Sequence, residues 1–283
     1  MIYVLTIAGS DSCGGAGIQA DIKTIHRLGA HALTAVTAVT AQNSVGVAAI
    51  HAVPAHFLSR QVDVLVSDVF PQAVKLGMLC SEGAVREVVR LIVRHGFSNV
   101  VLDPVLHAST GRGLLEGEEA LGALREELLP RVHVVTPNLE EAAILTGRKV
   151  RTLEEAGEAA RALHASGPDV VVTGGHLPGK CTDVLCDDSG LVLFEGERLN
   201  APCSHGTGCV FASSVAVFLA RGHPVREAVG RARAFVREAL REGYPCGKGR
   251  GVVNPLSGIS RSAHATEADS ESQDGPEGAG RLF

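Results

Sequence analysis

The feature that most constrains the fold of this 283-residue chain is an alternation of short apolar runs with longer amphipathic stretches. Short apolar runs are typical of buried parallel strands, and the stretches between them have helical spacing. The runs occupy residues 4–8, 74–78, 100–102, 132–135 and 170–172. The helical stretches occupy residues 16–28, 54–67, 82–95, 118–129, 152–166, 207–221 and 224–242. This alternation predicts an α/β fold with a central, mainly parallel sheet and helices on both faces.

The C-terminal half of the chain departs from this alternation in two places. Residues 181–199 have the pattern of a β-hairpin with its turn at residues 187–190, which predicts a small antiparallel edge on the sheet. Residues 261–283 hold five acidic residues and two arginines, but only Leu282 and Phe283 as large apolar side chains. A segment of this composition buries too little apolar surface to fold. We therefore predict one folded domain at residues 1–260 and a disordered acidic tail at residues 261–283.

The overall charge argues against polyanionic partners. The 31 acidic and 26 basic residues give a net charge of −5, which is unfavourable for binding nucleic acid or an anionic membrane. No apolar stretch approaches the roughly 18 residues of a membrane-spanning helix, and Lys23 comes too late to form the charged start of a secretory signal. The seven cysteines are an odd number in a long chain without the tight pairing of a disulfide scaffold, which favours reduced thiols. We expect a cytoplasmic protein.

A glycine-rich loop follows the first apolar run and occupies residues 9–17. In parallel sheets, ligands bind beyond the carboxyl ends of strands, and small residues there allow the backbone to approach a ligand closely. The glycine spacing matches neither the phosphate-binding loop of nucleotide hydrolases nor the dinucleotide-binding fingerprint. An ordinary flexible turn remains an alternative interpretation of this loop.

A second candidate site opens the apolar helix expected at residues 207–221. Gly206, Thr207 and Gly208 place unhindered N–H groups at the first turn of that helix, where such groups lack partners and the helix dipole favours anions. The same position is expected to lower the pKa of the Cys209 thiol from its free value of about 8.5. A buried structural cysteine is the alternative for Cys209.

Two acidic residues follow other predicted strands. Asp103 comes directly after residues 100–102, and Glu141 follows residues 132–135 by one short loop. Carboxylates at strand ends suit Mg²⁺, which prefers oxygen ligands and also engages substrate phosphates. Alternatively, Asn138 caps the next helix and Glu141 completes a capping box, an arrangement that is compatible with a metal role.

Taken in order, these segments resemble the hydroxymethylpyrimidine/phosphomethylpyrimidine kinases of thiamin synthesis, which belong to the ribokinase-like superfamily. The resemblance covers nearly all of residues 2–255, and the ordered set is far more specific than any one motif. The segments that carry it are residues 5–24, 37–47, 74–80, 103–115, 135–147, 170–177 and 205–209.

The resemblance implies a ribokinase-like fold and ATP-dependent phosphorylation of the hydroxymethyl group of an aminopyrimidine, and then of its monophosphate. It implies that the pyrimidine contacts are Gly9, Asp21, Gln42 and Met78. It implies that the anion hole is formed by Gly206, Thr207, Gly208 and Cys209, with Cys209 as the candidate base. It implies that ATP contacts Asn138, Thr173 and Gly175, and that Mg²⁺ is bound at Asp103 and Glu141. A homodimer is expected by analogy with related kinases.

The sequence departs from this family pattern at Thr173, where the pyrimidine kinases usually have a lysine that touches the transferred phosphates. The loop at residues 107–113 also lacks a familiar lysine, and Arg112 or Lys180 are the candidate substitutes. These departures leave the second phosphorylation less supported than the first. Three other functions remain open: a pyridoxal kinase of the same superfamily, a non-catalytic pyrimidine-binding protein, and a cysteine hydrolase that uses Cys209 with His205 or His176.

Overall fold

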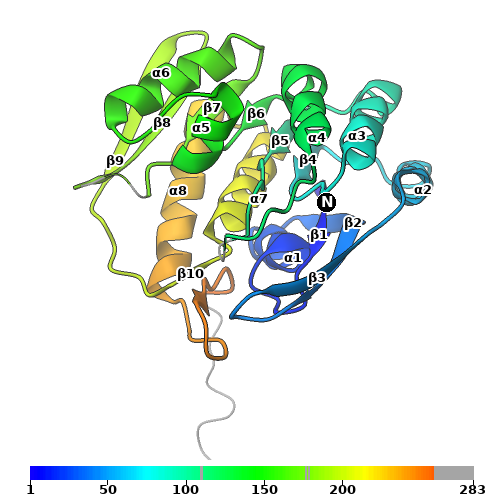
Figure 1. Cartoon of the computed structure of the whole chain (residues 1–283), viewed down its shortest axis with the longest axis horizontal. Coiled ribbons are helices and arrows are strands. Elements are labelled where there is room, and N and C mark those ends of the chain that lie inside the picture. Colours follow the sequence, from blue (N-terminus) through cyan, green and yellow to red (C-terminus); the bar gives the residue numbers. More distant parts are fainter. Residues whose placement is uncertain (109–110, 176, 178, 258–283) are drawn as a thin grey trace, which may run out of the picture.

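A central sheet organises the computed structural model of the protein, which describes residues 1–108, 111–175, 177 and 179–257 (Figure 1). Within the described residues, nine strands form this sheet in the order β3-β2-β1-β4-β5-β6-β7-β8-β9. The strands are β1 (Tyr3–Ser10), β2 (His31–Gln42), β3 (Val47–Ala52), β4 (Ala73–Leu76), β5 (Val100–Leu102), β6 (Val134–Val135), β7 (Asp169–Val172), β8 (Cys181–Asp187) and β9 (Gly190–Gly196). The six strands from β2 to β7 in this order pair in parallel.

Helices cover both faces of the sheet. One face carries α1 (Gly17–Arg27), α7 (Thr207–Ala220) and α8 (Val225–Arg241). The other face carries α2 (Ala55–Val66), α3 (Glu82–His95), α4 (Glu118–Ala123), α5 (Leu139–Thr146) and α6 (Leu153–His164). The prediction of a mainly parallel sheet between two helical layers is therefore confirmed.

Alternation along each strand divides the core between the two helical layers. In β5, Val101 packs with the layer of α1, α7 and α8, whereas its neighbours Val100 and Leu102 pack with the layer of α3 to α6. All three side chains are buried because successive residues of a strand point to opposite faces. This two-sided burial explains why the central strands are apolar without interruption.

Both edges of the sheet are antiparallel, although the sequence predicted only one such edge. The expected hairpin at residues 181–199 forms β8 and β9, and β8 also pairs antiparallel with β7. At the opposite edge, β3 pairs antiparallel with β2, and neither strand belongs to the predicted apolar runs. The sequence of β2 alternates small residues with threonines and contains no continuous apolar run. This pattern fits a strand that is only partly buried by the rest of the protein.

The helix predicted at residues 118–129 is less regular than its spacing suggests. It begins as α4, continues through a π-helical turn (Leu124–Leu128) and ends in a 3-10 turn (Leu129–Arg131). Pro130 prevents a regular helix from continuing there, because proline lacks the N–H that such a helix needs. The other predicted helices begin and end within two residues of the observed ones.

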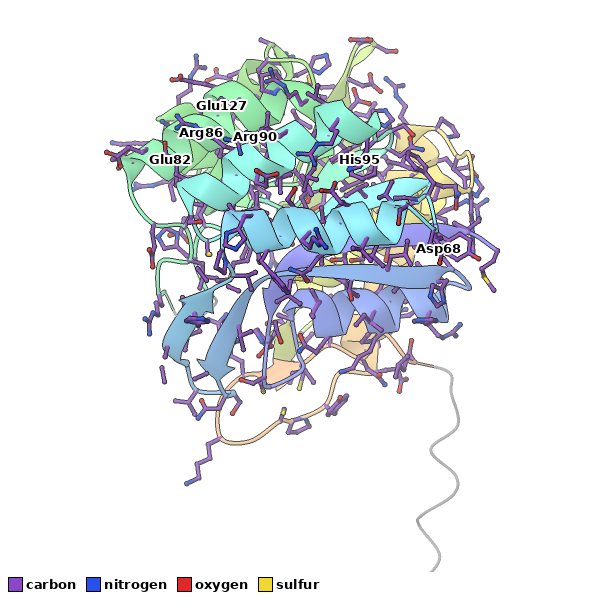
Figure 2. The ribbon with its side chains drawn as sticks, turned by 90° about the vertical axis from the view of Figure 1, so that its right-hand side faces the viewer. Asp68, Glu82, Arg86, Arg90, His95 and Glu127 are labelled. Atoms are coloured by element: carbon purple, nitrogen blue, oxygen red, sulfur yellow. The ribbon has the colours of Figure 1, made fainter. Side chains whose placement is uncertain are left out.

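The outer surface of α3 is charged (Figure 2). There Arg86 pairs with Glu82 at 2.7 Å and with Glu127 at 3.0 Å, and Arg90 pairs with Glu87. The Arg86 contacts are solvent-exposed, whereas Glu87 is buried against the rest of the protein, so α3 has one apolar and one solvated face.

A two-stranded parallel sheet brings distant parts of the chain together. It pairs β10 (Cys203–His205) with β11 (Gly251–Val252), and Tyr244 forms a further antiparallel bridge with Val252. This small sheet places the segment after α8 beside the glycine-rich loop (Figure 1). None of the described helices combines the length and apolarity needed to cross a membrane. The predicted acidic tail lies outside the described residues.

Candidate active site

A cavity of about 190 Å³ lies at the carboxyl ends of the parallel strands. Most of the predicted site residues line it: Gly9, Gln42, Met78, Asp103, Asn138, Glu141, Thr173, Gly206, Gly208 and Cys209. Ligands of open α/β sheets bind at this edge, so the fold itself gathers residues that are up to 200 positions apart in the sequence.

The glycine-rich loop at the cavity is an ordered turn built around Asp11. The carboxylate of Asp11 accepts hydrogen bonds from the N–H groups of Cys13 (2.8 Å), Gly15 (3.1 Å) and Ala16 (2.9 Å). His205 Nε2 lies 3.1 Å from the same carboxylate. Burial opposes ionisation, but these hydrogen bonds outweigh it and hold the pKa of Asp11 below its usual value. The flexible-turn interpretation is therefore wrong.

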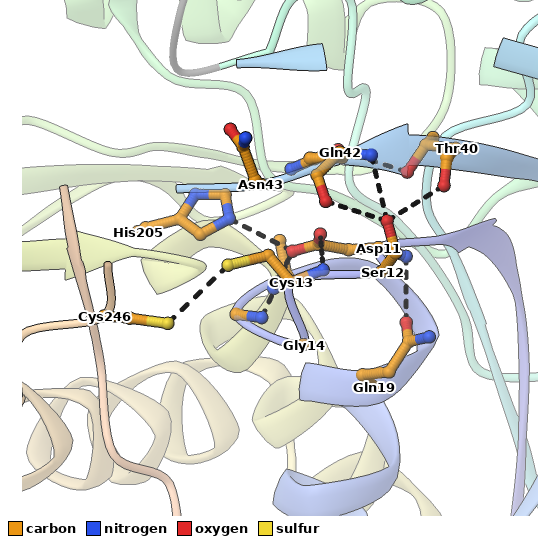
Figure 3. Close-up of polar contacts among 12 residues, drawn as sticks. Asp11, Ser12, Cys13, Gly14, Gln19, Thr40, Gln42, Asn43, His205 and Cys246 are labelled. Atoms are coloured by element: carbon orange, nitrogen blue, oxygen red, sulfur yellow. Dashed lines mark hydrogen bonds and ion pairs between the residues drawn. The ribbon is translucent and has the colours of Figure 1, made fainter. Parts of the chain in front are cut away.

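Ser12 fixes the same loop to β2, as Figure 3 shows. Its hydroxyl lies 3.0 Å from Thr40 O and 2.8 Å from Gln42 O, and Gln42 N–H donates to it at 2.9 Å. The Gln42 side chain lines the cavity. Across from it, a Cβ atom on Gly9 would lie only 3.0 Å from Met78 Sδ, so glycine keeps the space above the thioether open. An amide group and a thioether thus both line the cavity.

The N-terminus of α7 points at the cavity with unsatisfied N–H groups. The first intrahelical bond runs from Val210 N–H to Gly206 O at 3.0 Å, so the N–H groups of residues 207–209 lack intrahelical partners. Gly206 has φ +89°, and a Cβ atom there would lie 1.9 Å from Gly15 O. Only glycine fits this position, and the resulting helix start is suited to bind an anion. The Thr207 side chain is turned away from the cavity and donates to Ser204 O at 2.6 Å.

Below this helix start lies a buried lysine that the sequence analysis did not single out. Lys75 is completely buried and lines the cavity; its Nζ lies 3.0 Å from Asp21 Oδ2 and 4.0 Å from Asp103 Oδ2. Burial alone would lower the pKa of Lys75, but the attraction of Asp21, Cys209 and Asp103 outweighs it and raises that pKa above its usual value. The cavity floor therefore carries a permanent positive charge.

The structure places Asp21 outside the cavity lining, so its contact with the pyrimidine stays a prediction. The Asp21 side chain is fully buried and does not line the cavity. Its carboxylate accepts hydrogen bonds from Thr6 Oγ1 (2.6 Å) and Ser213 Oγ (2.8 Å) in addition to the pair with Lys75. In this structure the Asp21 carboxylate therefore holds Lys75 in place from outside the cavity.

The expected activation of Cys209 by the helix dipole is wrong. Complete burial raises the pKa of the Cys209 thiol to about 12, with Asp103 and Asp21 adding to the rise and Lys75 opposing it. The dipole of a helix start is worth less than the cost of burying a thiolate beside two carboxylates. Cys209 is therefore a protonated thiol at neutral pH, which argues against the cysteine-hydrolase interpretation.

Asp103 and Glu141 face the cavity as two buried carboxyl groups. Burial raises the pKa of Asp103 to about 6, with Lys75 opposing the rise and Asp21 adding to it. Burial and repulsion from Asp103 raise the pKa of Glu141 to about 8. Glu141 also completes the predicted capping box, since its carboxylate accepts from Asn138 N–H at 2.9 Å and its own N–H donates to Asn138 Oδ1 at 2.9 Å. Capping and a place in the cavity coexist.

This pair fits a divalent cation held partly by a ligand. Two carboxyl groups that repel each other in a buried cavity would both be stabilised by Mg²⁺, which is commonly bound by one or two carboxylates together with substrate phosphates. Among the described residues, no three His, Cys, Asp or Glu side chains form a preformed metal cage. Asp103 and Glu141 are therefore the residues that could hold such a metal together with a phosphorylated ligand.

The cavity wall around Thr173 has few charged groups. Thr173 lines the cavity, but Gly175 does not; its carbonyl oxygen instead accepts a hydrogen bond from Arg198 Nη1 at 2.6 Å. Neither candidate for the missing lysine reaches the cavity. Arg112 donates to Val47 O and Ala48 O of β3, and the exposed Lys180 pairs with Glu195 at 2.6 Å.

Sequence reasoning missed three residues of the site for one reason. Lys75 and Ser12 act through partners far away in the sequence, and Asp11 combines the distant partner His205 with N–H groups of its own loop. One signal was present: Lys75 is a charged residue inside an apolar strand, and a buried charge implies a buried partner and often a functional role.

A comparison with protein families decides which family has this combination of cavity and motifs. The family model described as phosphomethylpyrimidine kinase matches residues 11–254. The chain belongs to the phosphomethylpyrimidine kinase family. A hydroxymethylpyrimidine/phosphomethylpyrimidine kinase of Bacillus subtilis is 42% identical over 253 residues, which cover 88% of this chain and 93% of that protein. A thiamine biosynthesis bifunctional protein of Geobacter sulfurreducens is 44% identical over 255 residues. That match covers 89% of this chain and 52% of the bifunctional protein, so the chain spans about half of its length.

Solved structures place this phosphomethylpyrimidine kinase family member among related vitamin kinases. A phosphomethylpyrimidine kinase from Clostridium difficile superposes with a TM-score of 0.76 at 34% identity, covering 85% of this chain and 100% of the other. A pyridoxal kinase from Bacillus subtilis, solved with ADP, superposes with a TM-score of 0.83 at 35% identity, covering 90% and 97%. The ribokinase-like fold and the phosphotransferase class expected from the motifs are confirmed, and the second structure keeps a pyridoxal kinase as the rival.

Proposed function

We propose that this protein uses ATP to phosphorylate the hydroxymethyl group of 4-amino-5-hydroxymethyl-2-methylpyrimidine and then the resulting monophosphate, in thiamin diphosphate synthesis. The observation that carries the proposal is the lining of the cavity. The same cavity contains the N–H groups at the start of α7, the Lys75 ammonium, and the side chains of Gln42 and Met78. Anion-binding groups beside polar and apolar side chains suit phosphoryl transfer to a flat heterocycle. The family membership points to the same substrates.

The heterocycle would bind between Met78 and Gln42. A thioether packs well on the face of a flat ring, and an amide side chain can both donate to and accept from ring nitrogens and an amino group. Gly9 would let the ring lie against the backbone of the glycine-rich loop, since a larger residue would contact Met78. The fixed position of Gln42, bonded through its backbone to Ser12, would orient the hydroxymethyl group toward α7.

The transferred phosphoryl group would be bound by the N–H groups at residues 207–209. Phosphoryl transfer passes through a loose transition state, so positioning and neutralisation of charge matter more than covalent chemistry. The first turn of α7 supplies hydrogen-bond donors, and Lys75 supplies a full positive charge below them. Thr207 contributes only its backbone, because its hydroxyl is bonded to Ser204.

The proton of the substrate hydroxyl would leave through Cys209 and Asp103. As the hydroxyl oxygen bonds to phosphorus and the bond from phosphorus to the ADP oxygen breaks, the hydroxyl proton passes to Cys209 Sγ and the thiol proton passes to Asp103. A hydrogen bond between Cys209 and Asp103 supports this path, and the pKa of Asp103 near 6 leaves it ionised and able to accept at neutral pH. This route avoids a free thiolate, which burial opposes.

ATP would lie along Asn138 and Thr173, with Mg²⁺ held by Glu141 and by the oxygen of Asp103 that does not accept the proton from Cys209. When bound, the metal would neutralise the phosphates and hold them for in-line attack. The chain's own part is to keep two carboxylates facing the phosphates, and the capping box of α5 fixes one of them. We assign no phosphate contact to Gly175, since it lies outside the cavity lining.

The test measures ADP release with Mg-ATP and each of three acceptors: the hydroxymethylpyrimidine, its monophosphate and pyridoxal. Turnover of both pyrimidines supports the proposal, and turnover of pyridoxal alone supports the rival. Pyrimidine binding without ADP release would indicate the non-catalytic binding protein. Cys209→Ala should keep measurable residual turnover, about 10²-fold below the unmodified protein, because base catalysis contributes late in a loose transition state. Cys186→Ala, a buried cysteine of β8 outside the cavity lining, is the matched control.

Pyridoxal kinase is the second candidate because of one comparison and one residue. The Bacillus subtilis pyridoxal kinase superposes with the higher of the two TM-scores given above. The residue is Thr173, which stands where the pyrimidine kinases usually have lysine. Pyridoxal also carries a hydroxymethyl group on a flat nitrogen heterocycle, so the same cavity accommodates it. The three-acceptor assay separates the two functions directly.

We also propose that the protein acts as a cytoplasmic homodimer. The edge formed by β2 and β3 exposes Val39 by 51% and Val45 by 62%, an apolar surface beside the cavity that a second copy would cover. All seven cysteines, each within the described residues, are free thiols, which is typical of a reducing compartment. Sedimentation equilibrium tests the dimer, and Val45→Lys should shift the protein toward monomer.

A further inference from the structure

Two cysteines that belong to no part of the proposed chemistry lie side by side at the rim of the site. Cys13, in the glycine-rich loop, and Cys246, in the segment after α8, have sulfur atoms 3.7 Å apart (Figure 3). They are 233 residues apart in the sequence. Both are partly exposed, whereas Cys80, Cys186 and Cys209 are buried. The pair is therefore both close together and open to solvent.

The backbone holds the Cys13 sulfur in this place. Cys13 N–H donates to Asp11 at 2.8 Å, and the next peptide is held by Gly14 N–H to Asp11 O at 2.9 Å and by Lys23 Nζ to Gly14 O at 2.8 Å. These contacts anchor the loop on both sides of the thiol. The position of Cys13 is thus set by the same carboxylate that shapes the cavity.

The loop that carries Cys246 is anchored independently. Tyr244 and Val252 exchange two backbone hydrogen bonds of 3.0 Å across its base, and Gly249 N–H donates to Ser44 Oγ at 3.1 Å. The two loops are in direct contact, because a Cβ atom on Gly15 would lie 2.5 Å from Val252 Cγ1. Two anchored loops in contact keep the thiols within reach of each other.

We propose that Cys13 and Cys246 form a reversible disulfide that ties the glycine-rich loop to the C-terminal loop and slows turnover when the protein meets a peroxide. In the first step one of the two sulfurs attacks hydrogen peroxide, giving a sulfenic acid and one water. In the second step the other sulfur attacks the sulfenic sulfur, the S–S bond forms, and the oxygen leaves as a second water with the proton of that thiol. The two thiols are oxidised by two electrons and the peroxide is reduced.

The balance of these steps is the same whichever of the two thiols reacts first. Burial, and next the neighbouring Cys246 thiol, raise the pKa of Cys13 to about 11. The distance of 3.7 Å between the two sulfurs places the second thiol within reach of the sulfenic acid. A thiol reductant reverses the reaction by attack on the same bond.

The disulfide would disturb the cavity because the sulfurs must move together by about 1.7 Å, from 3.7 Å to the bonded length of about 2.05 Å. That movement pulls on the Cys13 peptide, whose N–H is one of the hydrogen bonds that hold Asp11. Asp11 also holds Gly15, Ala16 and His205 beside the start of α7. A shift of about 1 Å in such a support lowers turnover by about tenfold or more.

The first test maps the bond in the full-length protein after exposure to hydrogen peroxide, with thiols blocked by an alkylating reagent before digestion. We expect one disulfide-linked pair of peptides that carry Cys13 and Cys246, lost on treatment with dithiothreitol. Cys181 is the internal comparison, since it is also partly exposed but lies in β8, away from this loop pair. Oxidation of Cys181 with no linked Cys13–Cys246 peptides would overturn the proposal.

The second test measures turnover in the oxidised and reduced states. This effect rests on the proposed kinase activity, whereas the linked peptides do not: a reduced protein without turnover contradicts the proposed function alone. We expect kcat/KM to fall by about tenfold on oxidation and to recover with dithiothreitol. Cys246→Ser should keep the basal rate and lose the sensitivity, Cys13→Ser should also lose it, and Cys181→Ser should retain it. Equal inactivation of Cys246→Ser, or a linked but equally active protein, would overturn the proposal.

Discussion

The two walls of the cavity hold positive charge in different ways. On the wall formed by β1, β4 and α7, Lys75 is buried beneath the open helix start with its charge facing the cavity. On the wall around Thr173, the nearby cations face away from it. Arg198 donates to Gly175 O and Gly179 O, and Arg233 pairs with Asp183, whose other oxygen accepts Gly174 N–H at 2.8 Å. The cation of the first wall faces the cavity. The cations of the second wall bind backbone carbonyl groups and the Asp183 carboxylate.

This difference teaches where the site is fixed and where it can be altered. Lys75 sits in a closed network of buried partners, so removing the lysine leaves Asp21 and Asp103 buried without a cation. Thr173 belongs to no such charged network; its N–H donates to Pro137 O, and its side chain borders the cavity. Substitutions should therefore have large effects on the first wall and small or even favourable effects on the second.

Lys75→Met should break the first wall most severely. It leaves Asp21 and Asp103 buried without their cation, so the free energy of unfolding should fall by about 3–5 kcal/mol and turnover should be lost. Urea unfolding and ADP release measure the two effects. The matched control is Lys180→Met, which removes an exposed lysine paired with Glu195 and should change neither quantity. Equal stability of Lys75→Met and the unmodified protein would contradict the network.

Gly206→Ala should remove the anion-binding helix start. The alanine would meet Gly15 O at 1.9 Å in a backbone conformation with φ +89°, so the start of α7 must move. We expect kcat to fall by about 10²-fold, the usual loss when a preorganised donor is displaced. Gly222→Ala is the matched control, since Gly222 has φ +85° but open space around it. Similar losses in both variants would mean that backbone strain, and not the donors, causes the effect.

The pH dependence of the Mg²⁺ requirement tests Glu141, whose carboxyl group also faces the cavity. Burial raises the pKa of Glu141 to about 8, so this carboxyl is protonated below that pH and the proton competes with the metal. The Mg²⁺ concentration that gives half the maximal rate should fall by up to about tenfold per pH unit as the pH rises toward 8. Above pH 8 it should stay constant. Glu141→Gln should lose this dependence, and Glu140→Gln, next to it but exposed, should keep it. An unchanged dependence in Glu141→Gln would rule out its role.

Thr173→Lys should have the smallest effect, and a favourable one. A lysine there adds a cation to the wall that lacks one, so kcat/KM for the monophosphate should rise by about tenfold, the worth of one charged hydrogen bond. The first phosphorylation should change less. Ser189→Lys, at the exposed turn between β8 and β9, adds the same charge away from the cavity and should leave both rates unchanged. A loss of both rates in Thr173→Lys would mean that the cavity has no room for a lysine side chain at this position.

Much of the fold was predictable because burial on two faces leaves a plain pattern. The central strands are apolar throughout, and the helices alternate with them. The edge strand β3 and its neighbour β2 were missed because a strand with one open face mixes small, polar and apolar residues. Local spacing carries little information on such strands, since their position depends on tertiary contacts.

The site was predictable in its positions and less so in its electrostatics. Strand ends and a glycine at a helix start are visible in the sequence, so Asp103, Glu141 and Gly206 were found. The pairing of Lys75 with Asp21 joins residues 54 positions apart, and no local pattern reveals it. Cys209 illustrates the limit most clearly, because its position at a helix start was predicted correctly while its pKa depends on burial that only the fold determines.

The small sheet of β10 and β11 has a consequence for how the protein is made. Residues 203–205 pair with residues 251–252, and His205 closes onto Asp11 near the beginning of the chain. During translation the early strands leave the ribosome long before these partners exist. The glycine-rich loop therefore waits without its final contacts while most of the polypeptide is synthesised, and closing such distant contacts is slow. Assembly of the cavity should accordingly be among the last events in the maturation of the nascent chain.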